Sequence, residues 1–183
     1  MSRIGGTLTT RDLLTCAAFG TVGAALGLAI SPATGALAAA APPLYAVVAG
    51  AYSVMPVAAR MFTGMTGSTT ITAGVGGLLL IAVSPLGMLA LVPLLLSAAV
   101  IDAALWAVGR RNGNTVAGWA AAAIASAVLL FVVSLTVFSA AHLTAGFVIG
   151  ALAGRLVGQT AAVAALGDEV WVWAGDTVTA VAS

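Results

Sequence analysis

Residues 13–30 read LLTCAAFGTVGAALGLAI and contain no charged side chain. A helix that crosses the hydrocarbon core of a bilayer needs about 20 mainly apolar residues. The apolar region of a secretory signal peptide is shorter, at about 7–15 residues. The stretch therefore predicts a retained transmembrane helix that starts near residue 12 and ends near residue 30.

The whole chain shares this character. Of its 183 residues, 62% are hydrophobic and 6% are charged, and the mean hydropathy is +1.18. A soluble domain is about 45–50% apolar and about 25% charged. Because so few polar groups could not cover the surface of a soluble protein, lipid is expected to cover it. The chain has no lysine and no basic tract, so nucleic-acid binding is excluded as a function class.

Clusters of Pro, Gly, Arg and Ser divide the chain into apolar segments. They predict a single all-α domain over residues 1–183, a polytopic bundle of six transmembrane helices. A helix break is expected at Ser31-Pro32 and a kink at Pro56. The expected spans are residues 12–30, 43–61, 69–84, 86–108, 116–138 and 144–166, and residues 167–183 form a cytoplasmic tail.

The arginines give an orientation. Arg3 and Arg11 precede the first span, Arg60 ends the second, and Arg110 and Arg111 follow the fourth. If the N-terminus is cytoplasmic, all five lie on the cytoplasmic side, and the outer connections contain no basic residue. This is the positive-inside distribution, so both the N- and the C-terminus are predicted to be cytoplasmic.

Two predicted helices carry small residues at a spacing of four. Such a stripe lets another backbone approach closely. Two interpretations stay open: packing within the bundle, or docking of a separate membrane subunit. The stripes are Gly146, Gly150, Gly154 and Gly158 in the sixth span, and Gly20 with Ala24 and Ala17 with Thr21 in the first.

Asp102 and Arg155 are ionisable residues well inside predicted spans. A charge that faces lipid is costly, so both side chains are expected to face the interior. Their comparable depth predicts that they pair. A buried ion pair that fixes helix register is the favoured interpretation, and a direct substrate or proton role is the alternative.

The chain shows no nucleotide-binding, zinc-protease or nucleophile-elbow motif. A lone His142 is not a metal site, because metal ligands come in clusters. We therefore expect no enzyme activity, no cofactor and no metal. A ligand pocket should be mostly apolar with a few polar groups. The candidate substrate contacts, all in the outer half of the bundle, are Tyr45, Tyr52, Met88 and His142.

Several segments together resemble the substrate-binding S components of energy-coupling factor (ECF) transporters. The nearest subfamily is the YkoE-type group, which is linked to thiamine and its precursors. The segments are RDLL at 11–14, PVAARMFTG at 56–64, SPLG at 84–87, IDAAL at 101–105, GRR at 109–111 and the glycine stripe with GR at 154–155.

The resemblance implies a multi-pass vitamin-binding subunit of the bacterial cytoplasmic membrane. It would capture a small vitamin-like substrate from outside, with thiamine or a precursor as the first expectation. Its partners would be a transmembrane T subunit and ATPase subunits. The family docks its T subunit on an Ala-x-x-x-Ala feature in the first span; Ala17 matches it, Thr21 replaces the second alanine, and Gly20 with Ala24 is the alternative face.

Two other function classes remain. The runner-up is a non-catalytic scaffold or assembly subunit of a larger membrane complex, in which the glycine stripe serves a permanent partner. An intramembrane enzyme comes third, since it would need two polar catalytic groups within hydrogen-bond reach inside the bundle.

Overall fold

The computed structural model describes residues 9–83, 87–112, 116–137, 149–161, 163–164 and 166. Every regular element in these ranges is a helix, which confirms the all-α prediction. We refer to the helical residues 149–161 as the C-terminal segment. The other helices are α1 (Thr10–Ala40), α2 (Pro42–Ala51), α3 (Val54–Thr63), α4 (Ser68–Val83), α5 (Gly87–Asn112) and α6 (Val116–Val137).

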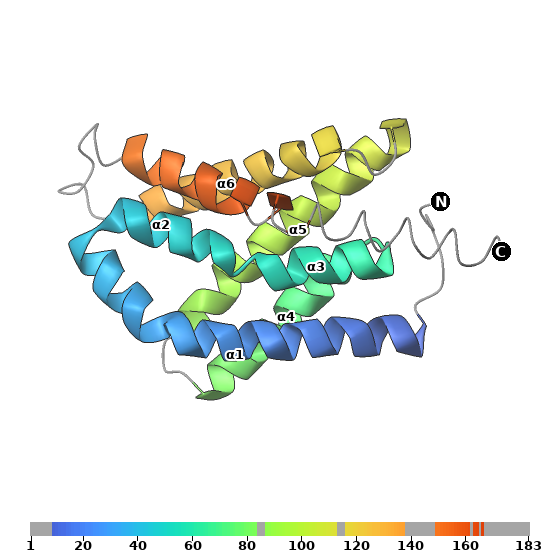
Figure 1. Ribbon diagram of the computed structural model, residues 1–183, viewed down its shortest axis with the longest axis horizontal. Helices are drawn as coiled ribbons and strands as arrows, with labels where there is room; N and C mark the ends of the chain where they lie inside the picture. Colours follow the sequence, from blue (N-terminus) through green and yellow to red (C-terminus); the bar gives the residue numbers. More distant parts are fainter. Residues whose placement is uncertain are drawn as a thin grey trace.

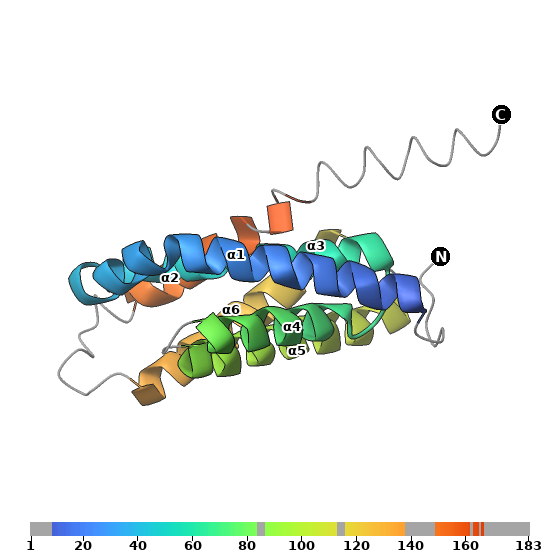
Figure 2. The ribbon, with the colours of Figure 1, turned by 90° about the horizontal axis from the view of Figure 1, so that it is seen from below.

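The helices form two layers. Figure 2 shows α1, α2 and α3 in one layer and α4 and α5 in the other. Helix α4 packs against α1 and α5, and α5 packs against α6. In Figure 1, α2 and α3 run back alongside α1, and the orange C-terminal segment lies beside α2. The first three helices thus form a layer across which α4 is laid.

Helix α1 begins with a capping box. The Thr9 hydroxyl accepts a hydrogen bond from the Asp12 N–H at 3.2 Å, and the Asp12 carboxylate accepts one from the Thr9 N–H at 3.3 Å. The predicted break at Ser31-Pro32 is wrong, because α1 continues to Ala40. An internal proline removes one backbone hydrogen bond, whereas a helix end leaves about four carbonyls without a partner. Continuing through Pro32 therefore leaves fewer backbone groups unpaired than ending the helix there would.

The second predicted span consists of two helices that meet at Tyr52 and Ser53. The kink predicted at Pro56 therefore lies up to four residues earlier. Proline has no N–H to offer the carbonyl of the residue four positions before it, here Tyr52, and its ring crowds that carbonyl. At the junction the Ser53 N–H bonds to the Gly50 carbonyl at 3.0 Å, and the Tyr52 N–H to the Ala49 carbonyl at 3.4 Å. Both bonds join residues three positions apart, whereas a regular α-helix joins residues four apart, so they mark a local break in the helix.

Among the other helices, α4 and α6 agree closely with the predicted segments. Helices α4 and α6 each lie within one residue of the prediction. Helix α5 continues past the predicted end at Val108 to Asn112. Arginine is a good helix former, so Arg110 and Arg111 extend the helix beyond its apolar part. The predicted sixth span contains the C-terminal segment, and the predicted tail lies outside the described residues.

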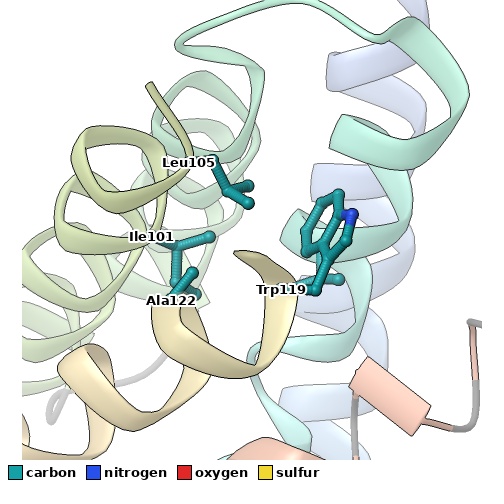
Figure 3. Close-up of a cluster of buried hydrophobic side chains, with 5 residues drawn as sticks. Ile101, Leu105, Trp119 and Ala122 are labelled. Atoms are coloured by element: carbon teal, nitrogen blue, oxygen red, sulfur yellow. The ribbon is translucent and has the colours of Figure 1, made fainter. Parts of the chain in front are cut away.

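An apolar core joins α3, α5 and α6. Figure 3 shows Ile101 and Leu105 of α5 facing Trp119 and Ala122 of α6. Val57 of α3 completes the cluster, and none of the five side chains is more than 5% exposed. Through this core, α3 packs against the layer that contains α5.

Within the described ranges, three helical stretches are long and apolar enough to cross a membrane: Thr10–Thr34, Leu44–Thr63 and Leu91–Val108. Ser68–Val83 and Ala117–Val133 are apolar helices of shorter length. Large side chains such as Leu14, Phe62 and Val83 are also about two-thirds exposed. Helices with this composition and this exposed surface are compatible with membrane insertion.

Candidate functional site

A small, partly open cavity lies between α1, α3, α4 and α5. Its volume is about 10 Å³, which is about the space that one water molecule needs. None of the described residues that line it is charged. The lining includes Gly20 and Gly23 of α1, Tyr52 and Met55 at the α2–α3 junction, Thr72 and Gly76 of α4, and Leu94 of α5.

One wall of the cavity is a close crossing of α1 and α4. A Cβ atom on Gly20 would lie 2.8 Å from the carbonyl oxygen of Thr72, and one on Gly76 would lie 3.0 Å from the carbonyl oxygen of Gly20. These separations leave no room for a side chain on either glycine. The two backbones therefore touch, as small-residue pairs allow in membrane helices.

Tyr52 is the one predicted substrate contact that the structure places at this cavity. Its ring lies against α1, where a Cβ on Gly27 would come within 2.9 Å of the Tyr52 Cε1 atom. Its hydroxyl donates to the Gly27 carbonyl across 3.4 Å, a long and therefore weak hydrogen bond. Tyr52 thus spans from the helix break to α1.

Thr72 is a cavity residue that sequence reasoning missed. It is 1% exposed, and its hydroxyl oxygen has no well-formed hydrogen-bond partner among the described residues. The thiol of Cys16 on α1 makes a weak side-chain hydrogen bond with it, because a thiol is a poor donor and a poor acceptor. Threonine is common in membrane helices, so nothing in its local sequence distinguishes it from a packing residue.

Asp102 forms the best-developed buried polar contact. Its Oδ2 atom accepts hydrogen bonds from the Thr70 N–H at 2.9 Å and from the Thr70 hydroxyl at 2.8 Å. Its Oδ1 atom lies 3.9 Å from Nη1 of Arg60, an ion pair too long for a hydrogen bond, and neither atom has a hydrogen-bond partner among the described residues. Arg60 is 7% exposed and Asp102 is 6% exposed, so both charges are withdrawn from the surface.

The predicted pairing of Asp102 with Arg155 is corrected by this geometry, because the ion-pair partner in the structure is Arg60. The arginine count assigned Arg60 to the cytoplasmic junction. In the structure it lies in the last turn of α3, where the helix dipole also favours a cation, and its side chain is directed inward.

Arg155 lies in the C-terminal segment and interacts electrostatically with Tyr45 of α2. Both residues are half-buried. Two of the predicted substrate contacts cannot be placed in the same way: Met88 belongs to α5 but its side chain is outside the described residues, and His142 lies outside them altogether. Of the predicted contact set, the structure thus places Tyr52 at the cavity, and Tyr45 interacts electrostatically with both Tyr52 and Arg155 without lining it.

The C-terminal segment packs closely against the α2–α3 junction. A Cβ on Gly50 would lie 2.6 Å from the Cα of Gly158, the last member of the predicted glycine stripe. Gln159, 2% exposed, donates from Nε2 to the Ser53 hydroxyl at 2.9 Å. Neither Gln159 nor Ser53 was predicted, although a glutamine inside an apolar span signals a buried polar contact.

The rest of the glycine stripe is only partly visible. Gly154 is buried and Gly150 is half-buried, while Gly146 lies outside the described residues. At Gly158 the stripe serves packing within the bundle. This agrees with the first of the two interpretations of the stripe at that position.

The two small-residue stripes of α1 face different surroundings. Gly20 and Ala24 are buried, and Gly20 lies directly on α4. Ala17 is half-buried and Thr21 is exposed, with its hydroxyl bonded back to the Ala17 carbonyl at 2.9 Å. The Gly20–Ala24 stripe is therefore used inside the bundle, and the Ala17–Thr21 stripe remains at the surface.

Within the described ranges, no three His, Cys, Asp or Glu side chains gather where they could hold a metal ion. Comparison of the chain with protein-family models, with curated proteins and with solved structures finds no match.

Proposed function

We propose that the chain is the substrate-binding S component of an ECF-type importer in a bacterial cytoplasmic membrane. In this proposal six spans cross the membrane with both termini inside. The chain captures a small vitamin or related micronutrient from outside and delivers it with a T subunit and ATPase subunits. The observation that carries the proposal is the cavity whose wall contains the helix break at Tyr52 and Ser53.

A broken helix suits a substrate site. The break lies inside the candidate span Leu44–Thr63, where the Tyr52 carbonyl lacks its usual donor because residue 56 is proline. Irregular backbone is tolerated at membrane depth where it lines a cavity, and transporters place substrate sites at such interrupted helices. An apolar lining with a few polar groups is also what small-molecule sites require.

The scaffold alternative relies on small-residue faces that serve a permanent partner. Gly158 packs on Gly50, and Gly20 packs on α4, so these positions are already used within the chain. Among the small-residue stripes that the structure describes in full, the Ala17–Thr21 stripe of α1 remains at the surface, where a detachable T subunit could dock. We therefore favour the transport role over the scaffold.

Thr21→Trp is expected to reduce the amount of ATPase that co-purifies with the chain by about tenfold or more, equivalent to about 1.4 kcal/mol of association free energy. The large ring would hold the T subunit away from the Ala17–Thr21 stripe. The measurement is the ratio of ATPase to tagged chain after mild detergent extraction from native membranes.

Leu26→Trp is the matched control. Leu26 is 48% exposed on the same helix but lies about 140° around the helix axis from Thr21. It should leave the ratio unchanged, and both variants should melt like the parent chain. Equal losses from both variants, or none from Thr21→Trp, would refute docking on this stripe.

A further inference from the structure

We infer that the cavity selects an uncharged small molecule, which hydrogen-bonds to the Thr72 hydroxyl, and rejects cations and anions of the same shape. This inference rests on the proposed substrate-binding function, and it names the chemical class of the substrate. Because thiamine carries a permanent thiazolium charge, the inference excludes thiamine itself and favours an uncharged molecule such as a neutral precursor.

The cavity offers no counter-ion. No described lining residue is charged, and the nearby carboxylate of Asp102 accepts two hydrogen bonds from Thr70 and has the Arg60 cation 3.9 Å away. A charge moved from water into an apolar site without a partner loses far more solvation than a neutral polar group does. A charged ligand would therefore bind much more weakly than an uncharged ligand of equal size.

Thr72 supplies the polar contact. Its hydroxyl is buried at the cavity without a well-formed partner, and a hydroxyl can both donate and accept. Gly76, one turn further along α4, leaves the neighbouring wall without a side chain. A ligand with one amide, hydroxyl or ring N–H group can thus satisfy Thr72 and lay its apolar part across the glycine wall.

The cavity must widen to admit such a molecule, and its walls allow this. Met55 is unbranched and adapts its shape readily. Tyr52 lies at the helix break, where its hydroxyl donates to the Gly27 carbonyl across 3.4 Å and also interacts with the Thr34 side chain. Tyr52 lies between α2 and α3, outside both helices, and Met55, in the first turn of α3, can change rotamer without a change in the helix backbone.

Benzamide, benzamidinium and benzoate test the inference, because they share one shape and differ in charge. Binding to the detergent-purified full chain, without partner subunits, is measured by equilibrium dialysis. Benzamide should bind at least about tenfold more tightly than either ion. Thr72→Val should weaken benzamide binding about fivefold, as expected for the loss of one hydrogen bond.

Two control variants accompany the test. Thr69→Val removes a neighbouring buried hydroxyl that does not line the cavity, so it should leave the affinity unchanged. Thr72→Ser keeps the hydroxyl and should retain binding. It therefore separates the effect of losing the hydroxyl in Thr72→Val from an effect of misfolding. Three results would each overturn the inference: equal or tighter binding of either ion, no binding of benzamide, or a benzamide affinity that Thr72→Val leaves unchanged.

The outcome is separable from that of the proposed function. Charge discrimination by a chain that never associates with an ATPase would support the pocket and defeat the transport role. Association with an ATPase by a chain that binds the two ions as well as benzamide would defeat the inference about the pocket alone.

Discussion

Gly158→Ala is expected to destabilise the folded chain, while Gly74→Ala is expected to leave it unchanged or stabilise it. At Gly158 a Cβ would lie 3.2 Å from the Cα of Gly50 and would also press on the Val47 carbonyl. These neighbours are backbone atoms, which cannot rotate away. Overpacking of this kind costs about 1–3 kcal/mol.

Gly74 is the matched control, since it too is a glycine within a helix. Its Cβ would meet Leu95 at 3.7 Å, an ordinary van der Waals contact. Alanine in place of glycine inside a helix gains about 0.5–1 kcal/mol. Thermal unfolding of both variants in detergent measures the difference, and a chain of this size should shift by about 2–4 °C per kcal/mol. If both variants melted alike, the close crossing of the C-terminal segment with α2 would be wrong.

Arg60→Met is expected to destabilise the chain by about 3–5 kcal/mol, because it leaves the buried Asp102 carboxylate without its cation. Adding Asp102→Asn should recover much of that loss. The neutral amide of asparagine needs no counter-charge, and its carbonyl can still accept from Thr70. Unfolding free energies of the two single variants and the double variant give the coupling energy between the two positions.

A second cycle serves as the control for the first. Arg155→Met combined with Asp102→Asn should be additive within about 0.5 kcal/mol, as expected of residues that share no contact. Strong coupling of Asp102 to Arg155 and none to Arg60 would restore the pairing that the sequence predicted and contradict the geometry seen here.

Most helices could be predicted because apolar runs and their interruptions are local properties. Helices α4 and α6 show this directly, since each is one uninterrupted apolar segment between turn residues. The proline effects were less predictable. Helix α1 continues through Pro32, whereas the helix is interrupted at Tyr52 and Ser53, just before Pro56. The same residue type has opposite outcomes because the tertiary surroundings decide whether the freed backbone groups find partners.

The candidate site depended more on long-range contacts. Tyr52 was identified from its aromatic ring and its position, but Thr72 and Gln159 became evident only when α1, α4 and the C-terminal segment were placed together. The partner of Asp102 was wrong for a related reason. Depth along a helix can be counted from the sequence, but the rotation of one helix against another cannot, and that rotation directs Arg60 inward.

The central claim is that the chain binds a small molecule for import driven by partner ATPases. The most direct measurement is mass spectrometry of the molecules released from the tagged chain after mild detergent extraction from its native membrane, followed by titration with the compound found. The account predicts one uncharged, vitamin-like compound in a near-equimolar amount, together with ATPase subunits in the same preparation. A chain that carries no small molecule and brings no ATPase with it would contradict the account.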